Sequence, residues 1–406
     1  MSMTSRTPRQ PLPEQVESPA RASPGPAEPA ARGARLAAVD MLRLVAALAV
    51  ASFHYLGTES PAYWGTAPTD FASPVHRMSM YGWLGVEAFF LISGFVICMS
   101  AWGRTPGQFA VSRLSRLYPA YWCALALVVL CMAVTVRGSG GLREAIAPRV
   151  VAANLTMAPG ALHVEPLDGV AWTLWVEARF YLLMAVVLAF GFTYHRMLGF
   201  CTVWLGVAAA GAEMSNRVVG EIALTDYAGL FVAGIAVYLM YRFGQNLLLW
   251  MVLGLAWLFQ LSEMYGRSSA HVLDTGSTQH TSWLVCTVLL TGFLALLMLA
   301  TIGPLAKLQW RWLVTGGALT YPFYLVHQSI GVPMGKELSA HVSWLGPWST
   351  VLLTLGSMLL LARLMNGLVE KPFGKLMRKH LAKGLNPPRV RAEAEAARAK
   401  AGAASA

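Results

Sequence analysis

The fold of this chain follows from two uninterrupted apolar stretches, LYPAYWCALALVVLCMAVTV at residues 117–136 and WLVCTVLLTGFLALLMLATI at residues 283–302. Neither stretch contains Asp, Glu, Lys or Arg. Each supplies the roughly 20 residues that a helix needs to cross the hydrocarbon core of a bilayer. Both stretches are therefore predicted to be membrane-spanning helices.

The composition of the whole chain agrees with a membrane protein. Of its 406 residues, 56% are hydrophobic and 13% are charged, whereas about a quarter of the residues of a soluble domain are charged. The formal net charge of +11 could suggest nucleic acid. The basic residues, however, lie in tails and short connections and do not interleave with aromatics in a patch, so we expect no nucleic-acid partner.

Ten apolar segments alternate across the bilayer in our prediction. Both termini are placed in the cytoplasm, because 21 of the 31 Lys and Arg residues then lie in the tails and inner connections. We therefore predict an all-α polytopic membrane protein with about ten transmembrane helices. The segments are residues 36–56, 82–102, 118–136, 170–190, 197–212, 225–241, 246–262, 282–302, 313–333 and 347–368.

The ends of the chain differ from its middle. Residues 1–35 are rich in Pro, Ala, Ser, Glu and Arg, a composition that predicts a disordered cytoplasmic tail with no signal peptide. Residues 36–373 form the predicted membrane domain, and residues 374–406 form a basic cytoplasmic tail. Any chemistry must then be performed by groups within the membrane or at its edge.

The first segment carries three ionisable residues in VDMLRLVAALAVASFHY, residues 39–55: Asp40, Arg43 and His54. Ionisable residues inside a span are costly and by default mark a function. The step from Arg43 to His54 corresponds to about three helical turns and about 16 Å of rise, so both share a helix face. Alternatively, Asp40 and Arg43 pair with each other and His54 caps the segment.

The second segment and the start of the third add an acid and two bases. Glu87 lies among aromatics, which predicts either a protonated acid or a cationic partner. Arg113 and Arg116 are three residues apart at the start of a helix, where two guanidinium groups form a good phosphate site. They could instead be plain positive-inside anchors.

The fourth and ninth segments add the remaining candidates. Glu177 is joined by the aromatic Trp172, which could also belong to an interfacial belt. Tyr324 and His327 share one helix face in LTYPFYLVHQ, where Pro322 loosens the backbone.

Depth separates the candidates into two layers. The acid and base residues His54, Glu87, Glu177 and His327 are predicted in the outer half of the membrane, and the arginines toward the inner half. Such a layout suits a transferase that takes a phosphorylated donor from inside and an acceptor from outside. The five cysteines show no metal-ligand spacing, and no metal is expected.

Six motifs in this order resemble those of the acyltransferase-3 family of integral membrane acyltransferases, which includes O-antigen and exopolysaccharide O-acetylases and macrolide O-acyltransferases. The resemblance covers residues 36–373. The motifs are D-x-x-R-x10-H at Asp40 to His54, G-V-E-x-F-F-x-x-S-G-F at Gly85 to Phe95, R-x-x-R at Arg113 and Arg116, W-x-L-x-V-E-x-x-F-Y at Trp172 to Tyr181, Y-x-x-Y-L-x-H at Tyr321 to His327, and E-K-P at Glu370 to Pro372.

The resemblance implies acetyl-CoA or another acyl-CoA as co-substrate, and a carbohydrate or small-molecule acceptor. It implies a multi-pass protein of a bacterial cell membrane, with an essential Arg and His pair at Arg43 and His54. It implies a donor motif at Arg113 and Arg116. Arg179 stands where the family often has an uncharged residue, so no role is assigned to it.

The resulting hypothesis is O-acyl transfer by His54, acting as general base or as transient acyl carrier, with a carboxylate orienting it. The residues fall into three predicted groups: catalytic His54, Arg43, Glu87 and Glu177; donor-binding Arg113, Arg116 and Arg43; and acceptor-binding Asp40, Trp172, Tyr324 and His327. The alternatives are a transporter with an intramembrane Glu and His proton relay, and a membrane scaffold or sensor without catalysis. The sequence predicts no oligomeric state.

Overall fold

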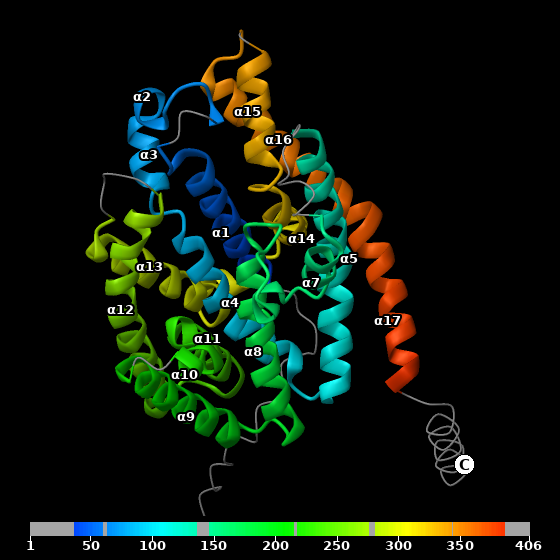
Figure 1. Cartoon of the computed structure of the whole chain (residues 1–406). Coiled ribbons are helices and arrows are strands. Elements are labelled where there is room, and N and C mark those ends of the chain that lie inside the picture. The colour runs from blue at the N-terminus through cyan, green and yellow to red at the C-terminus, as the bar shows by residue number, and fades with distance from the viewer. Residues whose placement is uncertain are drawn as a thin grey trace, which may run out of the picture. The chain divides into compact units, whose positions relative to one another are not determined.

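The computed structural model describes residues 36–59, 63–135, 146–214, 217–275, 281–342 and 344–385. Every regular element in these ranges is a helix (Figure 1), which confirms the all-α class. The longer helices are α1 (Ala37–Leu56), α4 (Leu84–Ala101), α5 (Pro106–Thr135), α8 (Ala171–Ala189), α9 (Tyr194–Glu213), α11 (Thr225–Phe243), α12 (Leu247–Thr275), α13 (Trp283–Thr301), α14 (Arg311–Val326), α16 (Pro347–Met365) and α17 (Lys371–Leu385).

Short elements connect the longer helices. They are α2 (Pro68–Phe71), α3 (Ser73–Ser79), α7 (Pro148–Leu155), η2 (Pro159–Leu162), α10 (Arg217–Ala223), η3 (Pro304–Lys307), α15 (Gly331–His341) and the π-helical turn η4 (Asn366–Glu370).

Eight helical stretches of the described residues are long and apolar enough to cross a membrane. They overlap eight of the ten predicted segments. The other two predicted segments form α9 and α14, helices of 20 and 16 residues that are not among these eight. The arrangement is that of a multi-pass membrane protein.

Helix α14 ends earlier than the predicted segment 313–333. Pro322 does not end the helix but lies inside it. The helix ends at Val326, and α15 begins at Gly331. The Tyr55 hydroxyl of α1 donates a hydrogen bond to the His327 carbonyl at 2.7 Å. This bond satisfies a carbonyl at the end of the helix, where intrahelical partners run out.

Glycines bring the central helices into contact. A Cβ atom on Gly94 of α4 would clash with the Phe231 carbonyl, and one on Gly234 of α11 would clash with the Leu91 carbonyl. Gly317 of α14 lies equally close to the Asp40 side chain of α1. These glycines allow α4 to pack closely against α11, and α14 against α1.

Helix α17 continues the line of α16 through η4. The Asn366 amide donates hydrogen bonds to the Ala318 carbonyl at 3.1 Å and to Glu370 Oε2 at 2.8 Å. Gly374 then allows α17 to approach the Ser115 carbonyl of α5, and α17 runs alongside the first half of α5 (Figure 1).

The structure describes only part of the two predicted tails. Residues 1–35 and 386–406 lie outside the described ranges. The predicted boundary at residue 373 falls inside α17, which continues as a helix to Leu385. The first twelve residues of the expected basic tail are therefore part of the helical structure.

Candidate functional site

Helix α1 carries both residues of the Arg and His pair on one continuous helix, as predicted. Arg43 lines two neighbouring cavities, and His54 lines a third. The two side chains thus lie along a succession of cavities between α1 and the helices packed around it.

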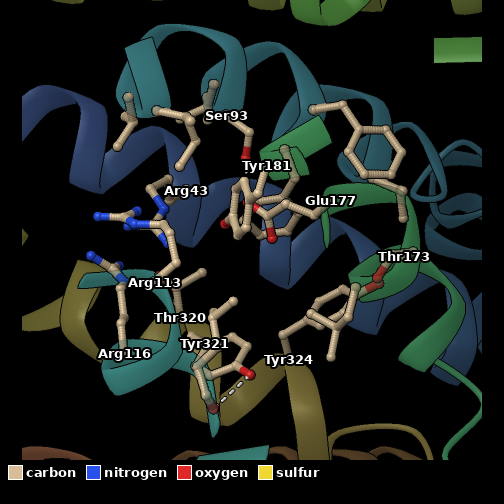
Figure 2. A pocket seen from close by; sticks show the side chains of 18 residues that line it. Arg43, Ser93, Arg113, Arg116, Thr173, Glu177, Tyr181, Thr320, Tyr321 and Tyr324 are labelled. Carbon is tan, nitrogen blue, oxygen red and sulfur yellow. Dashed lines mark hydrogen bonds between the residues drawn. The ribbon is translucent and has the colours of Figure 1, made fainter. Parts of the chain in front are cut away.

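The first of these, which we call the central cavity, contains all three predicted arginines. Figure 2 shows Arg43, Arg113 and Arg116 gathered on one side, Glu177 and Tyr181 between, and Thr173 with Tyr324 at the far side. Its chief polar lining consists of Arg43, Arg113, Arg116, Glu177, Tyr181 and Tyr321.

Glu177 is the carboxylate of the central cavity. Its Oε1 atom accepts a hydrogen bond of 2.8 Å from the Ser93 hydroxyl of α4, and it interacts with Tyr181 and Arg43. A cluster of guanidinium groups in a partly buried site needs such a counter-charge. Glu177 therefore lies with the arginines and not in the cavity of His54, although the sequence placed both in one acid and base layer.

The second cavity, which we call the basic cavity, is lined by five cationic and two acidic side chains: Arg43, Arg116, Lys371, Lys375, Arg378, Asp40 and Glu370. Asp40, a predicted acceptor-binding residue, lies here and not beside His54. Three of the cations come from α17, which the sequence placed mainly in a tail.

The third cavity, which we call the His54 cavity, holds the acid and base residues. Its principal lining residues are His54, Glu87, Trp172, Arg267, Tyr324 and Gln328. Of the two predicted orienting acids, Glu87 shares this cavity with His54. Trp172 is 43% exposed and lines the cavity from the start of α8.

The three cavities share walls. Arg43, Arg116 and Tyr321 line both the basic and the central cavity. Val86 and Tyr324 line both the central and the His54 cavity. The cavities therefore follow one another from the cations of α17 to His54.

Glu87 is completely buried and has a cationic partner that the sequence did not identify. Arg267 of α12 makes an ion pair with Glu87 of 2.5 Å and donates hydrogen bonds to the Asp226 carbonyl and the Tyr227 hydroxyl. The predicted segment 246–262 ends before Arg267, whereas α12 continues to Thr275. The acidic Glu263 lies one helical turn before Arg267, and this pairing could have indicated that the helix continues past residue 262.

His327 faces His54 across the end of α14, with ring centroids 5.3 Å apart. Its Nδ1 atom lies 2.8 Å from the Tyr324 carbonyl. Because a carbonyl can only accept, Nδ1 carries the proton and Nε2 is the acceptor of the neutral ring. This Nε2 atom is buried and has no hydrogen-bond partner within the described residues.

A clasp between the loop before α8 and the turn after α14 holds His327 in place. The Ser329 hydroxyl donates to Asp168 Oδ1 at 2.6 Å and accepts from the Gly169 amide at 3.2 Å. Burial raises the pKa of Asp168 to about 6, and the hydrogen bonds from Ser329 and Val170 oppose that rise. Sequence reasoning missed Asp168 because it lies in a loop outside every motif.

Two further residues have clear partners. Arg179, to which the sequence assigned no role, makes an ion pair with Glu221 and donates to the Glu221 carbonyl at 2.7 Å. Tyr324 shares a hydrogen bond of 3.0 Å with Thr173. Arg179 is therefore a structural residue, and Tyr324 is held at the wall between two cavities.

No group of three or more His, Cys, Asp or Glu side chains in the described ranges is placed to hold a metal ion. The five cysteines are free thiols, two of them on α5 and the others on α4, α9 and α13.

Comparison with known proteins places this chain in a family. A model of the acyltransferase domain of the acyltransferase-3 family matches residues 36–366. Nodulation protein 10 of Rhizobium leguminosarum bv. viciae is 31% identical over 173 residues, which cover 37% of this chain and 43% of that protein. No solved structure matches. The matched residues contain α1 to α16 and all six helices that supply the central and His54 cavities, so the chain belongs to the acyltransferase-3 family of integral membrane acyltransferases.

Proposed function

We propose that this protein is a membrane O-acyltransferase that moves an acetyl group from cytoplasmic acetyl-CoA to a hydroxyl group bound in the His54 cavity. The observation that carries the proposal is that successive cavities share wall residues, from the exposed cations of α17 to the neighbouring imidazoles of the partly buried His54 and the buried His327. Family membership supports acyl transfer and does not favour the transporter.

The basic and central cavities supply what a CoA thioester requires. Arginine guanidinium groups bind phosphate in a bidentate manner. Arg113 and Arg116 do not lie at the start of a helix, as the sequence suggested, but about two to three turns inside α5, which begins at Pro106. The flexible pantetheine arm would have to pass Tyr321 and Tyr324, which line the walls shared between the cavities, to reach His54. The rise of about 16 Å between Arg43 and His54 matches the reach of such an arm.

In the chemical step, the acceptor hydroxyl oxygen attacks the thioester carbonyl carbon while His54 takes the hydroxyl proton. The carbon–sulfur bond breaks, and the CoA thiolate leaves and regains a proton from His54. In the relayed variant, the His54 imidazole attacks the thioester carbonyl carbon, and the CoA thiolate leaves and takes the imidazole proton. The acceptor hydroxyl then attacks the acetyl group, and the departing His54 imidazole takes the hydroxyl proton. Glu87 lines the same cavity as an ion pair with Arg267, so the pair adds no net charge beside the imidazole.

The acceptor in this proposal is a hydroxyl of a carbohydrate, with a small-molecule hydroxyl as the second candidate. The aromatic Trp172 and the hydrogen-bonding Gln328 line the His54 cavity and are suited to stack on a sugar ring and bind its hydroxyls. We propose that the enzyme works in a bacterial cell membrane with both termini in the cytoplasm.

Rapid mixing of purified protein with labelled acetyl-CoA, in the absence of acceptor, tests the chemistry. Label bound covalently to the wild type and not to a His54→Ala variant supports the relay, whereas no covalent label supports direct transfer. Thioester consumption by the wild type should require added acceptor in the direct case. Flux of a substrate into proteoliposomes without consumption of acetyl-CoA would establish a transporter instead.

A further inference from the structure

Helix α17 lies beyond the family match, which ends at residue 366, and yet it forms one wall of the basic cavity. Lys371, Lys375 and Arg378 line that cavity from successive turns of the helix. No acidic residue occurs between Lys371 and Leu385. Lys371 belongs to the last of the six motifs, whereas Lys375 and Arg378 lie beyond both that motif and the family match.

The basic cavity has a charge imbalance that calls for an anionic ligand. Its five cations face two carboxylates, Asp40 and Glu370. Glu370 also accepts the hydrogen bond from Asn366 and interacts with Arg43, Arg116 and Lys371. An excess of three positive charges around one cavity is best neutralised by a ligand with several negative charges.

The cations of the basic cavity extend from the interior of the protein to its surface. Arg43 lies at the wall shared with the central cavity, and the three cations of α17 are exposed. The helix that carries them is held in place, because Gly374 packs against the Ser115 carbonyl and Arg378 Nε donates to Ser115 Oγ at 3.5 Å. The exposed cations thus occupy a defined position at the opening.

We propose that Lys371, Lys375 and Arg378 form a subsite for the 3′-phosphate on the adenosine end of CoA. This inference rests on the proposed use of an acyl-CoA donor. With the acyl end directed through the central cavity toward His54, the adenosine end remains at the opening of the basic cavity. The 3′-phosphate is a dianion separated from the diphosphate, so it needs cations beyond those near Arg43 and Arg116.

The test compares acetyl-CoA with 3′-dephospho-acetyl-CoA as competitors of labelled acetyl-CoA for the full-length protein in detergent. The wild type should bind acetyl-CoA about tenfold more tightly than the dephospho compound. The Lys375→Gln/Arg378→Gln variant should lose most of this preference by weakening acetyl-CoA alone. The matched control is Lys379→Gln/Lys383→Gln, which removes two exposed cations of the same helix that do not line the cavity.

Three results would overturn the subsite. They are an equal weakening of both compounds in the test variant, no weakening of either, and an equal loss of preference in the control variant. The last would show a diffuse electrostatic effect. If the wild type binds neither compound, the proposed donor itself is wrong, so failure of the function is distinguished from failure of the subsite.

Discussion

At the scale of single residues, the Glu87 and Arg267 pair shows how this chain keeps a carboxylate inside a membrane helix. An isolated buried charge is very costly, and a hydrogen-bonded partner of opposite charge offsets much of that cost. Arg267 is itself fixed by Tyr227, whose ring lies 4.4 Å from the guanidinium carbon. The pair therefore keeps both ionised side chains in the wall of the His54 cavity without leaving either partner alone.

Removing one partner of this pair should destabilise the protein more than removing both. We expect Arg267→Gln and Glu87→Gln each to lower the free energy of unfolding by about 3–5 kcal/mol, because one buried charge remains uncompensated. The double variant should recover part of that loss. Thermal unfolding in detergent measures these effects.

The matched control is the Arg179 and Glu221 pair, in which the Glu221 side chain is 59% exposed. Arg179→Gln should cost about 1 kcal/mol or less, since water screens such a pair. Equal losses at the two pairs, or no recovery in the Glu87→Gln/Arg267→Gln variant, would contradict the role assigned to burial.

Arg43 lines both the basic and the central cavity, so replacing its guanidinium group should affect acyl transfer. We expect Arg43→Lys to lower kcat/KM for acetyl-CoA by about 100-fold, because an ammonium group cannot replace a bidentate guanidinium. Arg363→Lys on α16 is the matched control, since Arg363 is exposed and lines none of the three cavities. Wild-type kinetics in the Arg43→Lys variant would contradict the donor role.

At the scale of elements, the crossing of α4 and α11 determines where the polar motif of α4 is presented. This crossing depends on Gly94 and Gly234, which leave no room for a Cβ atom. We expect Gly94→Ala to lower the free energy of unfolding by about 1–3 kcal/mol through overpacking against backbone. Gly254→Ala on α12 faces open space and should leave stability unchanged. Similar melting temperatures for the two variants would show that the crossing is not tight.

The Asp168 clasp joins two elements and should make stability depend on pH. The folded pKa of about 6 lies above the unfolded value of about 3.9, so the folded state binds the proton more tightly. Stability contributed by this group is present at low pH and falls as pH rises from about 4 to about 6.

We therefore expect the wild type to gain roughly 1–2 kcal/mol between pH 7 and pH 5 relative to Asp168→Asn, which keeps an acceptor for Ser329 and does not titrate. Melting curves of both proteins at the two pH values measure the difference. Parallel pH profiles would show that Asp168 does not titrate in this range.

At the scale of the whole molecule, the order of the cavities requires that the basic opening face the compartment that contains the donor. Reporter fusions at the N-terminus and at the C-terminus should both report the cytoplasm. A reporter inserted after Ala161, in the connection between α5 and α8, should report the opposite side. Termini on opposite sides, or a cytoplasmic signal from Ala161, would refute the proposed direction of transfer.

The sequence by itself determined the class of the fold, because apolar stretches of bilayer length leave the backbone no alternative to a helix. It also identified residues that share one helix, such as Arg43 and His54, since helical periodicity is a local property. The six motifs indicated the family as well, because each motif consists of residues that are close together along the chain.

Only the tertiary structure decided which helices bring their polar residues together. Depth along the membrane normal placed Glu177 with His54, but side-by-side packing of α4, α5 and α8 places it with the arginines. Arg267 lines the His54 cavity, and the cations of α17 line the basic cavity, because helices far apart in the chain pack together. Such contacts depend on glycines and turns that set how closely helices approach, and hydropathy carries no information about them.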